Sequence, residues 1–156
     1  MQRSAGFSRC GGYRYWLKRQ WSTLPGVTLV GLNPSSADAR KDDATLRRVI
    51  GFARDWGFGA VTVVNLFVWR TPRSAELKRA EDPIGPRNNY WLRRVTGSGD
   101  PVVVAWGNHG SYQDRDQFVL AMIDRPLCID VTRAGHPRHP LYSAGTCQLS
   151  AFPRHR

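Results

Sequence analysis

Residues 27–36 read V-T-L-V-G-L-N-P-S-S, an apolar run that ends in polar turn residues. Three further apolar runs, at 60–68, 102–106 and 127–131, are bounded in the same way by glycine, proline or asparagine. Short apolar runs between turn residues are typical of buried strands. The sequence therefore predicts four buried strands.

Helical patterns separate these runs. Between the first two, apolar residues recur at helical spacing with an aspartate to cap the helix and a glycine to end it: Asp42 or Asp43, Leu46, Val49, Ile50, Ala53 and Gly57. Residues 88–95 and 112–123 predict two further helices, and residues 13–19 an edge strand or hairpin. Alternating strands and helices predict one α/β domain over residues 1–156, with a central four-stranded, mainly parallel sheet flanked by helices.

The charge of the chain indicates a polyanionic partner. Lys and Arg number 23 against 12 Asp and Glu, which gives a net charge of +11, and all but three of the cations are Arg. Such a field favours phosphates, and the guanidinium fork matches their geometry better than a Lys ammonium does. We expect DNA as the partner, either double-stranded with a flipped base or single-stranded.

Several classes of protein are excluded by what the sequence lacks. Cys10, Cys128 and Cys147 are too widely spaced and too few for a disulfide framework or a metal cluster. His136 and His139 do not form a zinc pattern, so we expect no metal and no other cofactor. Apolar runs are too short to span a membrane and the N-terminus lacks an apolar signal core, so we expect a cytoplasmic monomer.

Polar and aromatic residues follow each predicted strand. They lie at 31–38 after the first run, at Asn65 and Arg70 in or after the second, at 106–109 after the third and at 135–142 after the fourth. In open sheets of this kind, ligands bind at the carboxyl ends of the strands. The four segments are therefore expected to form one site.

These segments resemble the motifs of the uracil-DNA glycosylase superfamily. Gly31-Leu32-Asn33-Pro34-Ser35 resembles the water-activating motif, and Val63-Val64-Asn65 the motif whose amide reads the Watson–Crick edge of a flipped pyrimidine. Val104-Ala105-Trp106-Gly107 is similar to the third motif, and His139-Pro140-Leu141-Tyr142-Ser143 to the final loop. The order also matches, over residues 27–145. The resemblance implies a glycosylase-like fold and activity.

The chain more closely resembles an uncharacterised bacterial and phage domain family with the pattern L-N-P-S, D-x-T, N-L-F, W-G and P-R-H-P-L-Y. It also departs from the glycosylases. Asn33 stands where their classical branch has Asp, and an amide can orient a water but cannot take its proton, which implies slow turnover. Both His136-Pro137 and His139-Pro140 fit the final loop; we favour His139 because Leu141 then follows in the wedge position.

The resemblance implies a role for each residue of the site. Asn33 would hold the attacking water and His139 would donate to the departing base, as catalytic residues. Substrate binding falls to Gly31, Leu32, Pro34, Ser35, Ser36, Asn65, Phe67 and Arg70. DNA binding falls to Arg138, Leu141 and Tyr142, with Leu141 filling the gap that a flipped base leaves.

Ser35 bears on the choice of base. By resemblance, the classical branch has at this position a Tyr that excludes the methyl group of thymine. A serine removes that wall, so we expect the site to accept pyrimidines with a C5 substituent.

Simpler interpretations stay open for several of these residues. Asn-Pro at 33–34 is a common turn, and Asn65 is explained equally by a structural hydrogen bond. Asp38, Asp42 and Asp43 with Thr45 fit helix-capping groups better than they fit a role in substrate binding. Two other functions also remain: base binding without hydrolysis, and hydrolysis of free nucleosides or nucleotides. The sequence does not separate DNA repair from defence against phage DNA.

Overall fold

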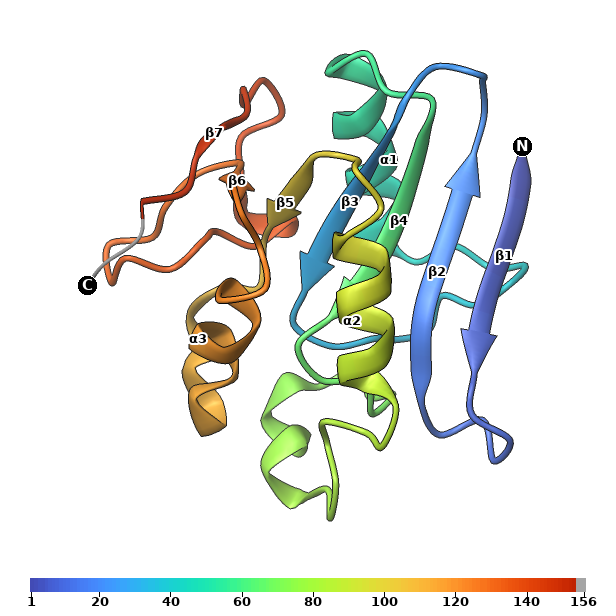
Figure 1. The fold of residues 1–156 in the computed structure, drawn as a ribbon, viewed down its shortest axis with the longest axis vertical. Helices are drawn as coiled ribbons and strands as arrows, with labels where there is room; N and C mark the ends of the chain where they lie inside the picture. Colours follow the sequence, from blue (N-terminus) through green and yellow to red (C-terminus); the bar gives the residue numbers. More distant parts are fainter. Residues whose placement is uncertain (154–156) are drawn as a thin grey trace.

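The computed structural model describes residues 1–153, and its strands form one mixed sheet in the order β1-β2-β4-β3-β5-β6-β7 (Figure 1). The parallel pairs are β3 with β4, β3 with β5 and β5 with β6, whereas β1–β2, β2–β4 and β6–β7 are antiparallel. The strands are β1 Gln2–Phe7, β2 Arg14–Gln20, β3 Gly26–Gly31, β4 Ala60–Asn65, β5 Val102–Val104, β6 Leu127–Cys128 and β7 Ser150–Ala151.

The predicted four-stranded, mainly parallel sheet flanked by helices is therefore wrong. The four apolar runs do supply β3, β4, β5 and β6, but three more strands extend the sheet, and they pair antiparallel. β7 has two exposed residues, and β1 is exposed over its first half, so neither leaves an apolar run. β2 is not an edge strand, because it lies between β1 and β4.

Few helices accompany the sheet. α1 begins after Asp43, whose side chain accepts from the Leu46 N–H at 2.8 Å, and ends before Gly57 with its φ of +88°, as the sequence predicts. The α-helices are α1 Ala44–Asp55, α2 Asn88–Thr96 and α3 Arg115–Leu120, and the 3₁₀ helices are η1 Ser74–Arg79, η2 Asn108–Asp114 and η3 Pro140–Tyr142.

The single helix predicted over 112–123 is broken in the structure. Gln113 and Asp114 have φ values of +56° and +52°, a left-handed conformation that ends one helical segment and starts another. Only the six residues of α3 are α-helical there. The apolar spacing of this segment reflects burial of Val119 and Leu120 in the core and not one continuous helix.

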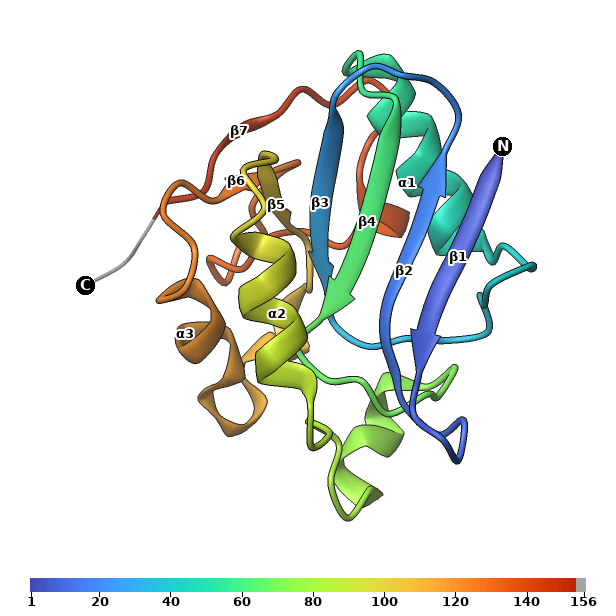
Figure 2. The same cartoon turned by 45° about the vertical axis from the view of Figure 1, so that its right-hand side comes forward.

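The few helices lie on opposite faces of the sheet, α1 on one and α2 with α3 on the other, as the two views in Figures 1 and 2 show. α1 packs through Leu46 and Val49 against Leu29 and Val61 on one face. α2 and α3 cover the other face, where a second core cluster surrounds the fully buried Phe67. The sheet thus separates two cores, and the carboxyl ends of β3, β4 and β5 meet at one edge between them.

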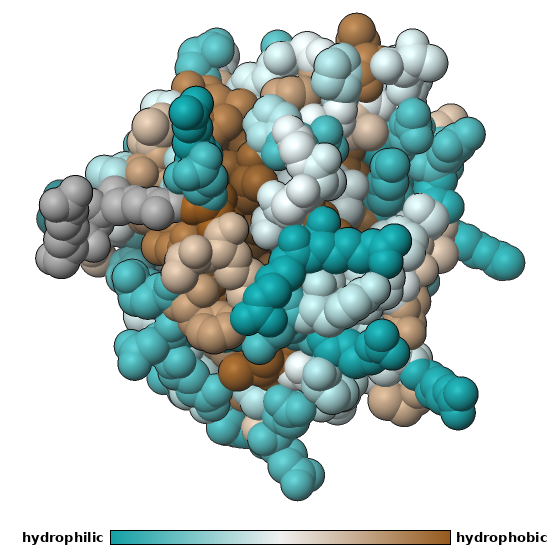
Figure 3. Space-filling model, viewed as in Figure 1, coloured by the Kyte–Doolittle hydropathy of each residue, from teal (hydrophilic) through white to brown (hydrophobic). Residues whose placement is uncertain are grey.

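Arginine side chains are frequent on the outer surface formed by α2 and α3. Figure 3 shows hydrophilic side chains among apolar ones on this side of the molecule. Arg87 lies over the ring of Tyr90 and Arg93 over the ring of Phe118, with 5.4 and 5.9 Å to the ring centroids. Tyr90 and Phe118 themselves are exposed. Guanidinium groups stacked in this way keep their charge at the surface.

Arg19 of β2 is buried completely, which is unusual for a charged side chain. Its Nε donates to the Asp42 carboxylate at 2.8 Å, and its other nitrogens donate to the carbonyls of Lys18, Asp38 and Lys41. The guanidinium therefore ties the loop before α1 to the sheet. This loop and the start of α1 form one wall of the cavity described below.

Within residues 1–153, no helix has both the length and the apolar character needed to cross a membrane.

Replacing Arg19 with methionine should destabilise the protein by about 3 kcal/mol, because a partly buried carboxylate and three carbonyls lose a fully buried donor. Arg3→Met is the matched control. Arg3 lies 4.0 Å from the same Asp42 carboxylate but is 41% exposed, so its loss should cost below about 1 kcal/mol. Urea unfolding measures both values. Equal, small effects of the two substitutions would show that Arg19 does not hold the loop.

Candidate functional site

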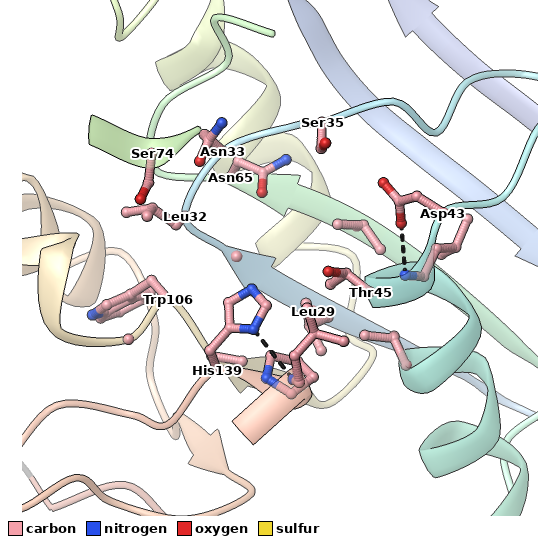
Figure 4. Close-up of a pocket in the computed structure, with 18 of the residues that line it drawn as sticks. Leu29, Leu32, Asn33, Ser35, Asp43, Thr45, Asn65, Ser74, Trp106 and His139 are labelled. Atoms are coloured by element: carbon pink, nitrogen blue, oxygen red, sulfur yellow. Dashed lines mark hydrogen bonds between the residues drawn. The ribbon is translucent and has the colours of Figure 1, made fainter. Parts of the chain in front are cut away.

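A cavity of about 630 Å³ opens at the carboxyl ends of β3, β4 and β5, on the face of the sheet that carries α1. Most of its lining comes from the loop after β3, the end of β4, residues 105–109, the start of α1 and the loop that leads into η3 (Figure 4). β2 and residues 71–74 complete it. A volume of this size accommodates a small organic ligand. Four of these segments are those that the sequence predicts to meet.

The floor of the cavity depends on the pairing of Gly31 with Asn65 at the ends of β3 and β4. A Cβ atom on Gly31 would lie only 2.8 Å from the Asn65 side-chain oxygen, so the amide occupies space that any other residue at position 31 would fill. Asn65 is 2% exposed, and its side-chain nitrogen has no hydrogen-bond partner among the described residues. An amide donor that is buried and unpaired is costly.

Asn88 of α2 secures the backbone beneath this amide. Its side chain is fully buried and donates to the carbonyls of Asn65 and Leu66, at 3.3 and 2.8 Å. Arg115 also donates to the Leu66 carbonyl, at 2.8 Å. The end of β4 is thus fixed from the opposite face of the sheet, while the Asn65 side chain remains free for a ligand.

Asn33 is anchored through one end of its amide only. Its nitrogen donates to the Pro34 carbonyl at 3.0 Å and to the Thr71 carbonyl at 2.9 Å, which uses both N–H groups. The Thr71 N–H donates back to the Pro34 carbonyl at 3.1 Å. Only the side-chain oxygen of Asn33 is available to a ligand, and Figure 4 shows it on the cavity side of the residue.

His139 is held as a hydrogen-bond donor. Its Nδ1 accepts from the Leu141 N–H at 3.2 Å, so in the neutral ring Nε2 carries the proton. Figure 4 shows Nε2 directed into the cavity, towards Asn65. Burial lowers the pKa of His139 below its usual value of 6.5, although the negative charge of Asp43 opposes the shift. The ring is therefore neutral at neutral pH.

The turn at Gly107 brings the His139 loop against the end of β5. Gly107 has a φ of +76°, which favours glycine, and its N–H donates to the Pro137 carbonyl at 2.8 Å. Trp106 lines the cavity beside this turn but is only 1% exposed. It forms a wall more than a freely accessible stacking surface.

Most residues that the sequence nominates line the cavity. These are Gly31, Leu32, Asn33, Ser35, Ser36, Asn65, Arg138, His139, Leu141 and Tyr142. Leu141 and Tyr142 are exposed by 44% and 76%, in the position expected of groups that contact a large ligand. Arg138 lies 3.2 Å from the Asp130 carboxylate, which offsets part of its charge.

Three nominated residues do not line it. Phe67 follows the end of β4, and its side chain is fully buried on the other side of the sheet, against Tyr112. Arg70 stacks on the ring of Phe7 and donates to the Gly11 carbonyl. Pro34 is buried and contributes its carbonyl to the loop structure. The other candidate histidine, His136, lines a separate cavity of about 280 Å³.

The cavity also holds polar residues that the sequence analysis does not nominate as site residues: Arg14, Asp43, Thr45, Thr71, Ser74, Asn108, His109 and Thr132. Asp43 does cap α1, as predicted, and the same side chain faces the cavity. Arg14 is 4% exposed and donates to the Ala37 carbonyl; burial lowers its pKa to about 10, so it stays charged. Its place could not be predicted, because β2 was expected at the sheet edge.

No cluster of three or more His, Cys, Asp or Glu side chains suited to a metal ion occurs in the described part of the chain. The cavity is lined instead by amides, hydroxyls, two imidazoles, two guanidinium groups, one carboxylate and apolar groups. Its chemistry is that of hydrogen bonding to a polar, partly apolar ligand.

Comparisons with known proteins give one match. A family model described as "Protein of unknown function (DUF1643)" covers residues 14–141, which include all of the cavity segments except Tyr142. No curated protein and no solved structure matches the chain significantly. The resemblance to the uracil-DNA glycosylase superfamily is not tested by these comparisons and stays a prediction.

The state of His139 can be measured directly. Because the folded pKa is lowered, the folded protein resists protonation, so the free energy of unfolding should fall as the pH drops below 6.5 towards the folded value. Above pH 6.5 this group should have no effect. NMR titration of the ring should give a midpoint below 6.5, and His139→Gln should weaken the loss of stability in acid. A midpoint at or above 6.5 would contradict the assignment of a buried, neutral donor.

Proposed function

The chain belongs to the DUF1643 family, whose function is unknown, and we propose that it hydrolyses the N-glycosidic bond of a pyrimidine nucleotide turned out of DNA into the cavity. The observation that carries this proposal is the buried amide of Asn65, whose nitrogen lacks a partner and whose oxygen lies over Gly31. A ligand that accepts from this nitrogen would remove the cost of an unpaired donor, about 1 to 3 kcal/mol.

A pyrimidine edge fits the polarity of this amide. Asn65 offers one donor and one acceptor side by side, which complements the adjacent carbonyl and ring N–H of uracil or thymine. Rotating the amide by half a turn would suit cytosine. The hydroxyl of Ser35 also lines the cavity, which supports the expectation that a C5 substituent is tolerated.

His139 and Asn33 supply two further parts of the chemistry. Breaking an N-glycosidic bond leaves negative charge on the base, and the Nε2–H of a neutral imidazole can donate to it without a proton transfer. The side-chain oxygen of Asn33 can accept from a water molecule and orient it, because both N–H groups of that amide are engaged elsewhere. Backbone contacts thus leave His139 only as a hydrogen-bond donor to the ligand and Asn33 only as an acceptor.

Charge and exposed side chains support a polymeric substrate. The net charge of +11 favours DNA over a free nucleoside, because several phosphates are attracted at once. Leu141 and Tyr142 are exposed beside His139, where apolar groups can occupy the space that a flipped base vacates. A free nucleoside would make no use of them.

A second candidate is base binding without hydrolysis. The neutral amide of Asn33 favours it, because this residue can orient a water but cannot accept its proton. Both candidates share the cavity and the Asn65 contact. They differ only in whether abasic product forms.

Excision assays on DNA with uracil, thymine, 5-hydroxymethyluracil, cytosine or 5-methylcytosine distinguish the candidates. We expect abasic sites from at least one pyrimidine, and a loss of turnover of about 100-fold or more in Asn65→Asp and in His139→Ala. Asn65→Asp removes the unpaired donor at constant size. His136→Ala is the control, because His136 lines the other cavity and its loss should leave turnover unchanged.

Saturable binding of these oligonucleotides without abasic product would favour the binding protein. Neither binding nor product from any substrate would reject both candidates. Normal turnover in His139→Ala with loss in His136→Ala would show that the site has been assigned to the wrong histidine.

A further inference from the structure

The proposed hydrolysis requires a group that takes a proton from the attacking water, and neither nominated catalytic residue can act as that base. Asn33 is a neutral amide. The Nδ1 atom of His139 is occupied by the Leu141 N–H, so its Nε2 must carry the proton and can only donate. The base has to be another group that reaches the cavity.

Asp43 is the one carboxylate among the described residues that line the cavity. His109 also lines the cavity, but its side chain is exposed to solvent. Figure 4 shows Asp43 across the cavity from Trp106, on the wall formed by the start of α1. Its two oxygens accept from the Leu46 N–H at 2.8 Å and from the Ala37 N–H at 3.2 Å. A carboxylate has about four acceptor positions, so each oxygen retains one for a water molecule.

Two charged or titratable groups from other segments face this carboxylate. Arg14 of β2 and His139 before η3 both have their pKa values raised by the negative charge of Asp43, against the effect of burial. The neighbouring carboxylate of Asp42 is differently placed, because Arg19 binds it and it does not line the cavity. Asp43 is therefore in electrostatic contact with the site, and Asp42 is turned away from it.

We propose that Asp43 is the general base of this chain, a role that rests on the proposed hydrolysis. The water oxygen bonds to C1′ of the sugar while the bond from C1′ to the base nitrogen breaks. The electron pair of that bond leaves on the base, where the Nε2–H of His139 donates to it. One proton of the water passes to the Asp43 carboxylate and then to solvent or to the departed base.

A cap of α1 is the alternative role for Asp43, and two substitutions separate the roles. Asparagine and glycine both serve as N-caps, so Asp43→Asn and Asp43→Gly retain a helix start while removing the base. We expect each to reduce single-turnover excision by about 100-fold or more while the affinity for substrate DNA changes little. Asp55→Asn, an exposed carboxylate at the far end of the same helix and outside the cavity, is the matched control and should keep wild-type turnover.

One further readout reports on the base itself. Formate, which fits the space left by the carboxylate, should restore part of the turnover in Asp43→Gly.

Turnover of Asp43→Asn close to that of wild type would overturn the proposal. So would an equal loss in Asp55→Asn. A loss in Asp43→Gly that is matched by weaker DNA binding and lower stability, without rescue by formate, would also overturn it, because that is the behaviour of a helix cap alone. Wild-type protein that excises none of the pyrimidines would overturn the proposed function and this inference together. That result differs from failure of the inference alone, in which wild type remains active.

Discussion

The parallel register of β3 and β4 determines the chemistry of the cavity. It places Gly31 opposite Asn65 at the last pair of the two strands, where the missing Cβ leaves room for a side-chain amide. The amide is buried, its nitrogen has no partner among the described residues, and Asn88 holds the backbone below it. We attribute this polar group to a ligand, because an unpaired buried donor otherwise only reduces stability.

Backbone contacts fix the polarity of the other groups around this amide. Asn33 can only accept and His139 can only donate, since their remaining atoms bind carbonyls or an N–H of their own loops. Arg19 holds the loop before α1, and so it positions the wall that carries Asp43. A site assembled from such fixed groups needs little rearrangement when a substrate enters, which favours catalysis by preorganised dipoles.

The sequence predicts α1, α2 and the residues that meet in the cavity, because these follow from local spacing and from strand ends. It does not predict the extent of the sheet. The charges of Arg14 and Arg19 in β2 suggest an exposed edge strand, yet both side chains are buried by contacts with a loop that lies about twenty residues further along the chain. Asp43 shows the same limit of prediction. The local sequence around it predicts a helix cap, but it does not reveal that the same side chain also lines the cavity. The sequence wrongly places Phe67 in the site, because the apolar run at 60–68 continues beyond Asn65, where β4 ends.

The central claim is that the Asn65 amide reads the edge of a nucleobase. A crystal structure of the His139→Ala protein with DNA containing an uncleavable pyrimidine nucleotide tests it most directly. The account predicts a base turned into the cavity, with a ring carbonyl or ring nitrogen within hydrogen-bonding distance of the Asn65 side-chain nitrogen. DNA bound elsewhere on the surface, with the cavity empty and that nitrogen still unpaired, would contradict it.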